Sequence, residues 1–379
     1  MVEFYQDFTL GIVGGGQLGR MLIQSAIDLN VDVAILDADP NAPCSKLASR
    51  FVNGPLTDYN TLLSFGRTCD LVTIEIENVN VKALYQLQKE GVKVYPQPEV
   101  IELIQDKRKQ KQFYQDQGIP TADFVLVENA EDVKNHAEFL PAFNKLGKEG
   151  YDGRGVQRIA SASDLNKAFD KPGLLEKLID FEKELSVIVA RNAKGEMKAF
   201  PPVELVFHPE ANLVEYLFAP ARISGDKVSE ATEIAQKVIE KLDMVGLLAV
   251  EMFLDKEGQI FVNEIAPRPH NSGHQTIEAN VTSQYEQHLR AIFNMPLGDT
   301  GILQPSAMVN LLGEPGYEGL ARYEGLEKVL AVNGAHVHLY GKKITKPYRK
   351  MGHVTIVDNK EQRLLDKADF IKRTLKIKA

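Results

Sequence analysis

The sequence has few of the features that mark secreted, membrane-spanning or nucleic-acid-binding proteins. Its 379 residues include only two cysteines, Cys44 and Cys69, whose spacing matches neither a disulfide framework nor a zinc site. No apolar run reaches membrane-spanning length, and the acidic N-terminus differs from the basic start of a signal peptide. A net charge of −8 gives no general attraction for nucleic acid. We expect a cytoplasmic protein with small-molecule partners, and neither nucleic acid nor membrane among them.

The first forty residues have the pattern of a strand, a helix and a second strand. Thr9 to Gly16 is β-rich and ends in glycines, Leu18 to Leu29 has helical apolar periodicity, and Asp32 to Asp37 is again β-rich. The run Gly14 to Gly19 fits the G-x-G-x-x-G pattern, whose backbone amides can approach a phosphate at a helix N-terminus, and Asp37 could accept a ribose hydroxyl. A tight turn without a ligand is the alternative.

Two acids end the next predicted strand. Asp70 to Glu77 reads as a strand that finishes with Glu75 and Glu77. Ligands of open α/β sheets bind at the carboxyl ends of the strands, so either acid could contact a substrate. Acids exposed at a strand end are the rival interpretation.

A basic helix and a glycine-rich hairpin follow. Glu99 to Gln117 is predicted as one helix, and one of its basic residues could reach a phosphate across a domain junction. Farther on, four glycines lie within the nine residues Gly147 to Gly155, between the predicted strands Leu140 to Lys145 and Val156 to Ile159. Such a tip can fold its amides over a triphosphate, with Lys145 as a point charge. A flexible surface turn is the alternative, but it leaves the basic residues around the glycines unexplained.

The strongest candidate for a metal site is a predicted hairpin of Gly246 to Leu254 and Gln259 to Glu264. With a loop of two or four residues, Glu251 and Glu264 fall on the same face as diagonal neighbours. A three-residue loop would send them to opposite faces, because a slip of one residue inverts the alternation. Two carboxylates among apolar residues need a counter-charge, and magnesium held with the Asn263 oxygen would supply it. Glutamates facing water on an edge strand are the alternative.

Other stretches carry weaker signals. The strand Leu174 to Ile179 could present its backbone to an adenine ring, with Glu184 near the ribose hydroxyls. The loop Gly341 to Lys350 concentrates basic residues in an acidic protein, so a phosphorylated substrate is a reasonable expectation, and a solvated basic loop is the alternative.

The order of these features resembles the ATP-grasp superfamily. Within it, four segments are similar to the carboxyaminoimidazole ribonucleotide synthetase family of purine biosynthesis: Gly14 to Met21, Gly150 to Gly155, Asn263 to His274 and Arg349 to His353. The similarity extends over nearly the whole chain, and Asn263 to His274 is its most specific part.

The resemblance implies an α/β and α+β multidomain fold. It predicts an N-terminal Rossmann-like pre-ATP-grasp domain at residues 1–105, an ATP-grasp domain at 106–300 with a lid at about 121–190, and a small C-terminal β-rich domain at 301–379. It also implies a homodimer.

The implied activity is that of an ATP-dependent carbon–nitrogen ligase that carboxylates aminoimidazole ribonucleotide with bicarbonate through carboxyphosphate, using ATP and Mg²⁺. The resemblance assigns magnesium to Glu251, Glu264 and Asn263. It assigns bicarbonate and the substrate amine to Tyr151, Asp152, Arg154, Arg268 and His270. It assigns the ribonucleotide to Gln17, Leu18, Glu75 or Glu77, Lys342, Arg349 and Lys350. It assigns ATP to Lys107, Lys145, Gly150, Tyr151, Asp152, Gly153, Arg154, Gly155, Val156, Glu176, Lys177, Leu178, Ile179, Glu184, His208, Asn263 and Glu264.

Three alternatives compete with this interpretation. A formate-dependent glycinamide ribonucleotide transformylase shares the fold and ATP, but the run Arg268 to His274 favours the carboxylase. A nicotinamide-dependent oxidoreductase would use the first glycine motif and leave the second one unexplained. A catalytically silent nucleotide-binding regulator is disfavoured by the presence of Lys145, Glu251 and Glu264.

Overall fold

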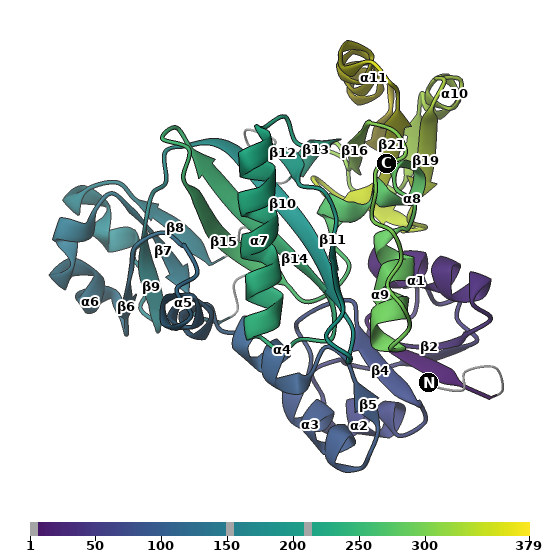
Figure 1. The fold of residues 1–379 in the computed structure, drawn as a ribbon, viewed down its shortest axis with the longest axis horizontal. Helices are drawn as coiled ribbons and strands as arrows, with labels where there is room; N and C mark the ends of the chain where they lie inside the picture. Colours follow the sequence, from purple (N-terminus) through teal and green to yellow (C-terminus); the bar gives the residue numbers. More distant parts are fainter. Residues whose placement is uncertain (1–6, 149–154, 208–213) are drawn as a thin grey trace.

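The computed structural model describes residues 7–148, 155–207 and 214–379. Figure 1 shows a small sheet with its helices at the left, a long central sheet crossed by one helix, a parallel sheet below it and the C-terminal elements at the upper right. Among the described helices, none combines the length and the apolar character needed to cross a bilayer.

The N-terminal region is a five-stranded parallel sheet, and its strand–helix–strand opening is as predicted. The strand order is β3-β2-β1-β4-β5, so β2 and β3 lie on one side of β1 and β4 and β5 lie on the other. Open α/β sheets bind their ligands at such a switch point, which here lies between β1 and β4. The elements are β1 (Thr9–Val13), α1 (Gln17–Asp28), β2 (Asp32–Asp37), β3 (Arg50–Asn53), α2 (Tyr59–Gly66), β4 (Leu71–Ile74), α3 (Val81–Lys89) and β5 (Lys93–Val94).

The single helix expected over Glu99 to Gln117 is wrong, because the chain forms two helices there. These are α4 (Pro98–Ile104) and α5 (Lys107–Asp116). The Asp106 carboxylate accepts a hydrogen bond from the Arg108 amide at 3.0 Å and so caps the second helix. The break places Lys107 at the start of a helix, where its side chain can turn toward the central sheet.

The segment predicted to be a lid, called the lid below, contains a four-stranded antiparallel sheet with strand order β6-β9-β7-β8. The hairpin of β7 and β8 forms as predicted, and most of its tip lies outside the described residues. Buried side chains on these strands and on α6 form a small separate core. The elements are β6 (Phe124–Val127), α6 (Ala130–Asn135), η1 (Ala137–Phe139), β7 (Ala142–Leu146), β8 (Val156–Ile159), η2 (Ala162–Lys167) and β9 (Gly173–Lys177).

The central antiparallel sheet has nine strands in the described chain, with β15-β14-β10-β12-β13-β16-β21-β19 in order and β11 beside β10. Because β13 pairs with β16, this sheet continues past residue 300 into the C-terminal region. The strands are β10 (Phe181–Arg191), β11 (Met197–Ala199), β12 (Val203–Phe207), β13 (Val214–Ala219), β14 (Gly246–Asp255), β15 (Ile260–Ala266), β16 (Ser306–Leu312), β19 (Ala335–Leu339) and β21 (Lys350–Val357).

One face of the central sheet is buried under α7 (Gly225–Lys241), which crosses the sheet in Figure 1. The period of two along β10 and β14 places Val187 and Val250 in the core under α7, so Ser186 and Glu251 point to the opposite face. Near that face lie η3 (Asn271–Gly273), α8 (Thr276–Ala279) and α9 (Gln284–Ile292). The C-terminal region adds β17 (Gly319–Leu320), β18 (Arg322–Glu324), α10 (Leu326–Leu330), β20 (Ile344–Thr345), α11 (Glu361–Thr374) and β22 (Lys376–Lys378).

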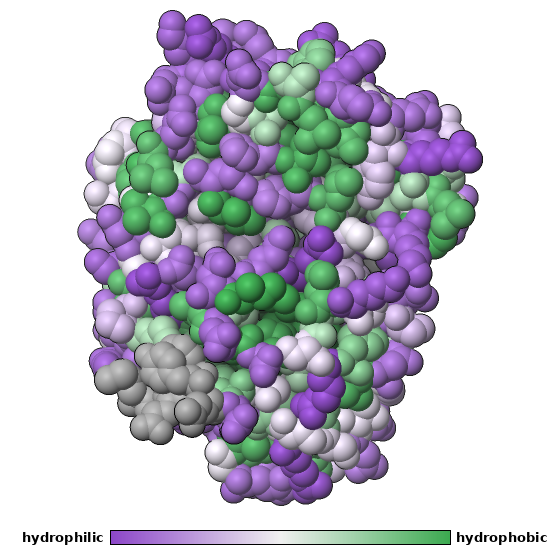
Figure 2. Space-filling view, turned by 90° about the vertical axis from the view of Figure 1, so that its right-hand side faces the viewer, coloured by the Kyte–Doolittle hydropathy of each residue, from purple (hydrophilic) through white to green (hydrophobic). Residues whose placement is uncertain are grey.

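The face formed by the N- and C-terminal regions shows apolar patches separated by polar residues (Figure 2). Two exposed apolar residues lie on adjoining segments, because the Leu303 amide donates to the Ala279 carbonyl and the Val281 amide donates to the Gly301 carbonyl. Leu303 and Val281 are 67% and 52% exposed. Their proximity makes this part of the surface a candidate for contact with another chain.

Candidate active site

Glu251 and Glu264 lie directly opposite each other on β14 and β15. The hairpin loop has three residues, because the Asp255 amide donates to the Gln259 carbonyl at 2.9 Å and Lys256 to Gly258 lie between them. Gly258 takes a positive φ of 82°, as a three-residue hairpin requires. The predicted diagonal register is therefore wrong, and by alternation alone this loop would separate the two carboxylates.

A β-bulge at Asn263 restores the common face. Met252 pairs with Val262 but Glu251 pairs with Glu264, so Asn263 is the extra residue. Val262 and Ile265 both lie in the core under α7, which shows that the side-chain alternation changes phase between them. The bulge brings the two carboxylates closer than the prediction did, with Asn263 beside them.

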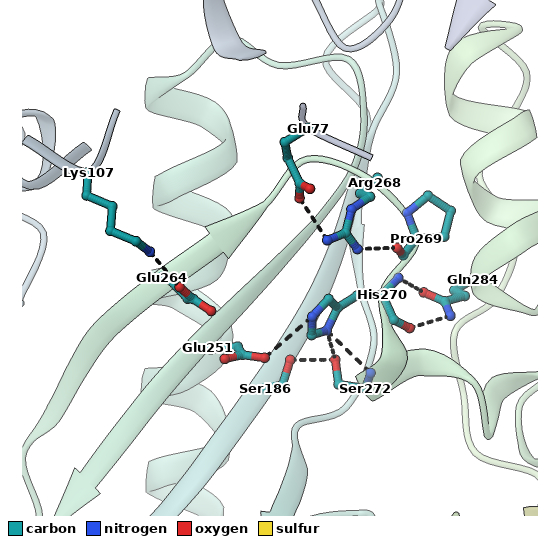
Figure 3. A network of polar contacts seen from close by, with 10 residues as sticks. All are labelled: Glu77, Lys107, Ser186, Glu251, Glu264, Arg268, Pro269, His270, Ser272 and Gln284. Carbon is teal, nitrogen blue, oxygen red and sulfur yellow. Dashed lines mark hydrogen bonds and ion pairs between the residues drawn. The ribbon is translucent and has the colours of Figure 1, made fainter. Parts of the chain in front are cut away.

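The pair does not have enough positive charge around it. Lys107 Nζ lies 3.0 Å from Glu264 Oε2, and this ammonium holds the pKa of Glu264 well below its usual range. Burial, followed by the charge of Glu264, raises the pKa of Glu251, and His270 Nε2 lies 3.5 Å from Glu251 Oε1 (Figure 3). Burial and Glu264 likewise raise the pKa of Glu184 to about 7. This face of the sheet therefore lacks a counter-charge that a cation would supply.

A second carboxylate in the cleft is fully compensated. Glu176 of β9 lies 2.6 Å from both Lys145 Nζ and Lys111 Nζ, and the two ammoniums outweigh burial to lower its pKa. Lys111 Nζ also donates to Thr121 Oγ1, whose hydroxyl donates to the Val262 carbonyl at 2.7 Å. The same lysine thus connects the lid sheet, the start of the lid and the strand that carries Asn263.

Lys145 is the contact between the lid and the bulge. Besides Glu176, its Nζ lies 3.4 Å from Asn263 Oδ1. Lys107 and Lys145 therefore approach the carboxylate pair from α5 and β7, one to Glu264 and the other to the amide oxygen beside it. Two ammoniums converging beside two carboxylates form a site suited to a polyphosphate and its cation.

The polar segment Arg268 to His274, which follows β15, is fixed by hydrogen bonds to the His270 backbone. The Gln284 side chain accepts from the His270 amide at 2.8 Å and donates to the His270 carbonyl at 2.7 Å (Figure 3). Burial, and next the charge of Arg268, lower the pKa of the His270 imidazole to about 3, so the ring is neutral. Arg268 in turn lies 2.9 Å from Glu77. The run therefore places a neutral imidazole and a guanidinium next to Glu251.

The first glycine turn binds carboxylates of the protein itself. The Gly16 and Gly19 amides donate to the two oxygens of Glu75 at 2.6 and 2.8 Å, and the Gly15 amide donates to Asp37 at 2.6 Å. A Cβ at Gly14 would lie 2.4 Å from the Glu75 side chain, which explains the need for glycine there. The prediction that these amides face a phosphate, with Asp37 on a ribose, is wrong because both acids have structural roles.

The start of α1 still offers donors. The amides of the first turn of a helix have no partner within the helix, and Gln17 and Leu18 are its first two residues. The Gly16 and Gly19 amides donate to Glu75. The Gln17 and Leu18 amides are therefore the ones in this turn that could donate a hydrogen bond to a ligand.

A basic pocket of about 340 Å³ lies between the N- and C-terminal regions. Lys342, Lys343 and Arg349 line it from the C-terminal loop, and the segment Asp39 to Pro43 lines it from the N-terminal region. Lys343 Nζ donates to Asn41 Oδ1 at 2.7 Å across this gap. The pocket has the size and charge for a phosphorylated sugar.

The remaining predicted residues are distributed as follows. Lys177 turns away from the carboxylate pair, with Nζ 4.6 Å from the centre of the Phe139 ring. Leu178 and Ile179 are half-buried in the connection from β9 to β10, and Gly155 and Val156 begin the returning strand of the lid hairpin. Lys350 begins β21. The predicted residues outside the described part of the chain are Gly150, Tyr151, Asp152, Gly153, Arg154 and His208.

Sequence reasoning missed the roles of Lys111 and Asn271. The sequence analysis does not single out Lys111 among the basic residues of the helix, although its spacing of three residues from the buried Tyr114 indicates the inner side of α5. The Asn271 side chain is 8% exposed, and neither its Oδ1 nor its Nδ2 has a hydrogen-bond partner among the described residues. A buried amide of this kind is suited to a polar ligand.

The donor set on this face fits a hard divalent cation. Within the described residues no group of three or more His, Cys, Asp or Glu side chains forms a metal site. Glu251, Glu264 and Asn263 Oδ1 instead provide oxygen donors on neighbouring strands and leave room for phosphate oxygens, which is the arrangement that magnesium prefers. The raised pKa of Glu251 also fits a cation site, because a bound cation would stabilise the charged form of a carboxylate that lies beside another carboxylate.

Three family models match the chain. They are described as a ribonucleotide synthetase preATP-grasp domain over residues 8–105, an ATP-grasp domain over 112–285 and a phosphoribosylaminoimidazole carboxylase C-terminal domain over 306–367. The predicted fold class is thereby confirmed, whereas the predicted domain limits remain predictions.

Similar proteins agree on one family. The crystal structure of N5-carboxyaminoimidazole ribonucleotide synthetase from Thermotoga maritima is 44% identical, with a TM-score of 0.90 over 98% of this chain and 99% of that one. The synthase from Aspergillus clavatus, solved in complex with ADP and 5-aminoimidazole ribonucleotide, is 35% identical, with a TM-score of 0.86 over 96% and 99%. The synthase of Bacillus subtilis is 35% identical over 364 residues, 94% of this chain and 93% of that protein.

The chain also matches longer proteins. It spans between 63% and 66% of the length of three relatives named phosphoribosylaminoimidazole carboxylase. These findings support the carboxylase interpretation over the transformylase and the oxidoreductase. The chain belongs to the N5-carboxyaminoimidazole ribonucleotide synthase family of ATP-grasp ligases.

Proposed function

We propose that the chain catalyses the ATP-dependent carboxylation of aminoimidazole ribonucleotide by bicarbonate, giving N5-carboxyaminoimidazole ribonucleotide, ADP and phosphate. The observation that carries the proposal is the cross-strand pair Glu251 and Glu264, approached by Lys107 and linked through Asn263 to Lys145. Such a constellation is suited to holding a nucleotide's terminal phosphoryl group.

The ATP subsite extends from the bulge toward the lid. Lys107 and Lys145 would bind phosphate oxygens, which would displace their present contacts with Glu264 and Asn263. The edge from Glu176 to Ile179 is proposed to contact the adenine ring, and Glu184 the ribose hydroxyls. Magnesium on Glu251, Glu264 and Asn263 would neutralise charge on the transferring phosphoryl group. The glycine-rich tip of the lid and His208 belong to the proposal by family resemblance.

The reaction proceeds in two steps. A bicarbonate oxygen attacks the γ-phosphorus of ATP and the bond to the β-phosphate oxygen breaks, which gives ADP and carboxyphosphate. The exocyclic amine of the ribonucleotide then forms a bond with the carboxyl carbon, directly or after release of carbon dioxide, while phosphate leaves and the amine loses a proton. Arg268 and His270 are proposed to orient the one-carbon acid beside Glu251, and the unpartnered amide of Asn271 would bind one of the reactants. Tyr151, Asp152 and Arg154 join them by resemblance.

The ribonucleotide would span two regions. Its phosphate is proposed to bind in the basic pocket lined by Lys342 and Arg349, Lys350 joins them by family resemblance, and the amides of Gln17 and Leu18 would donate from the start of α1. Glu77 and Glu75 lie at the end of β4, but Glu75 already accepts two amide hydrogen bonds. We therefore favour Glu77, which pairs with Arg268, as the acid nearer the reacting amine.

A test of the reaction compares two substrate pairs. ADP release is measured with aminoimidazole ribonucleotide plus bicarbonate, and separately with glycinamide ribonucleotide plus formate, each with ATP and magnesium. Release only with the first pair supports the proposal, and release only with the second would replace it with the transformylase. Absorbance changes with NADH test the oxidoreductase.

Association and location are also part of the proposal. We propose a cytoplasmic homodimer, and the exposed Val281 and Leu303 are the residues we would place at its interface. Light scattering of the purified chain measures its mass. A Leu303→Glu variant that remains folded but becomes monomeric would support this interface, and a monomeric parent chain would contradict the homodimer.

A further inference from the structure

Two buried serines connect β10 to the imidazole of His270. Ser186 Oγ lies 2.7 Å from Ser272 Oγ, and Ser272 Oγ lies 2.9 Å from His270 Nδ1 (Figure 3). On its other side the ring approaches Glu251 Oε1 with Nε2 at 3.5 Å. Both serines are 1% exposed. The chain of contacts therefore runs from the sheet through two hydroxyls and the ring to a proposed metal ligand.

The direction of the hydrogen bonds follows from one backbone amide. The Ser272 N–H donates to His270 Nδ1 at 3.3 Å, and an amide N–H cannot accept. The Ser272 amide and the Ser272 hydroxyl can both donate to Nδ1, and together they favour the form in which Nδ1 carries no proton. In a neutral ring the proton then lies on Nε2.

The hydroxyl groups fit the same direction. Ser272 Oγ can donate its proton to Nδ1 and accept a hydrogen bond from Ser186 Oγ. Within the described part of the chain, Ser186 Oγ has the Ser272 hydroxyl as a hydrogen-bond partner. All donors then point from Ser186 toward the ring, and the ring donates from Nε2 toward the Glu251 carboxylate. The Gln284 amide fixes the His270 backbone, so the ring is held at both ends.

We propose that Ser272, supported by Ser186, is a positioning residue that locks His270 in the Nε2–H tautomer. This rests on the proposed function, in which His270 lies beside the reacting one-carbon acid. Locked in this way, His270 presents a hydrogen-bond donor to carboxylate oxygens in the cleft. It cannot accept the proton that the amine loses, because its site-facing nitrogen already carries one. The amine proton must therefore go to another group.

The tautomer can be measured without any activity. The full-length chain is labelled with ¹⁵N-histidine, and the His270 signals are assigned by their disappearance in His270→Gln. We expect a pyrrole-like nitrogen at Nε2 and a pyridine-like nitrogen at Nδ1. In Ser272→Ala the amide donor remains but the hydroxyl is lost, so a fraction of the Nδ1–H form is expected. A pyrrole-like Nδ1 in the parent chain would overturn the proposal, and so would a tautomer that does not change in Ser272→Ala.

Kinetics separate positioning from packing. We expect Ser272→Ala to lower kcat about tenfold, because one buried acceptor loses a donor, while KM for ATP stays unchanged. Ser272→Thr keeps the hydroxyl and should retain most of the parent kcat. Ser186→Ala is the matched control, with a loss of about threefold or less, since Ser272 can still donate. An equal loss in Ser272→Thr and Ser272→Ala would show a packing role and overturn the proposal.

The two proposals fail separately. If the parent chain releases no ADP with aminoimidazole ribonucleotide and bicarbonate, the proposed function fails, yet the expected nitrogen signals still stand. If ADP is released but the signals show the opposite tautomer, the function stands and the positioning role fails.

Discussion

Carboxylates of the same candidate site differ in how the protein compensates their charge. Glu176 on the lid lies 2.6 Å from two lysine ammoniums, and its pKa is lowered in spite of burial. Burial and then the charge of Glu264 raise the pKa values of Glu251 and Glu184 on the central sheet, although Lys350 and Arg268 act on Glu251 in the opposite direction. The first carboxylate is neutralised by the protein, whereas the other two are arranged for charge that arrives with a ligand.

The difference separates structure from function within one site. A carboxylate that the fold itself neutralises is part of the architecture, and losing its partner should destabilise the chain. A carboxylate that the fold leaves without a cation should be tolerated or even relieved by substitution, and the cost should appear in catalysis. Of the four predictions below, ordered from the largest expected effect to the smallest, those on Lys111 and Glu184 test this contrast directly.

Glu264→Gln should leave the chain folded but lower magnesium-dependent ATP turnover at least about a hundredfold, because one of the two carboxylates among the proposed metal ligands loses its charge. ADP release with the ribonucleotide and bicarbonate measures this, and the melting temperature checks folding. The matched control is Glu257→Gln at the exposed tip of the same hairpin, which should retain parent activity. Near-normal turnover in Glu264→Gln would refute the assignment.

Lys111→Met should lower the free energy of unfolding by about 3 kcal/mol, because a buried ion pair loses one partner. Urea denaturation measures the change, and Lys109→Met on the exposed side of the same helix is the control. The double variant Lys111→Met with Glu176→Gln should recover part of the loss. If Lys109→Met were as destabilising as Lys111→Met, the contrast between the two kinds of carboxylate would have no basis.

Arg349→Ala should raise KM for the ribonucleotide about tenfold and leave KM for ATP unchanged, since it removes a charge-assisted contact from the basic pocket. Initial rates with each substrate varied in turn provide the measurement. Lys346→Ala, in the same loop but outside the pocket lining, is the matched control. An effect confined to ATP would place Arg349 in the wrong subsite.

KM for ATP should fall several-fold as the pH rises from about 6 to 8. Burial and Glu264 raise the pKa of Glu184 to about 7, so its carboxyl keeps its proton below that pH and becomes a charged acceptor for ribose hydroxyls above it. Glu184→Gln, which cannot ionise, should show a KM for ATP that does not vary over this range. A pH dependence that persists unchanged in the variant would exclude Glu184 as its source.

Local patterns predicted much of the architecture. The strand–helix–strand opening and the limits of β2 and β8 follow from hydrophobic periodicity and glycine positions. The split of the basic helix was missed because residues 105–112 contain no apolar residue whose spacing could show where one helix ends, and the second helix begins at the capping carboxylate of Asp106.

The site was predictable in its residues and not in its geometry. Glu251 and Glu264 stand out in the sequence, but their alignment depends on a bulge, which leaves no mark in a two-residue alternation. The first glycine motif was misleading for a related reason. The sequence shows that amides are available, whereas the carboxylates that accept from them come from the distant strand ends at Glu75 and Asp37.

The unbroken central sheet has a consequence for how the enzyme can move. The strand of Glu251 and the strand that begins at Lys350 belong to one hydrogen-bonded plate, connected through β10, β12, β13 and β16. The distance between the proposed nucleotide and ribonucleotide subsites is therefore fixed by the hydrogen-bonded strands between them. If the proposed subsites close over their ligands, we expect the four-stranded sheet of β6 to β9 to move and the central sheet to keep its shape.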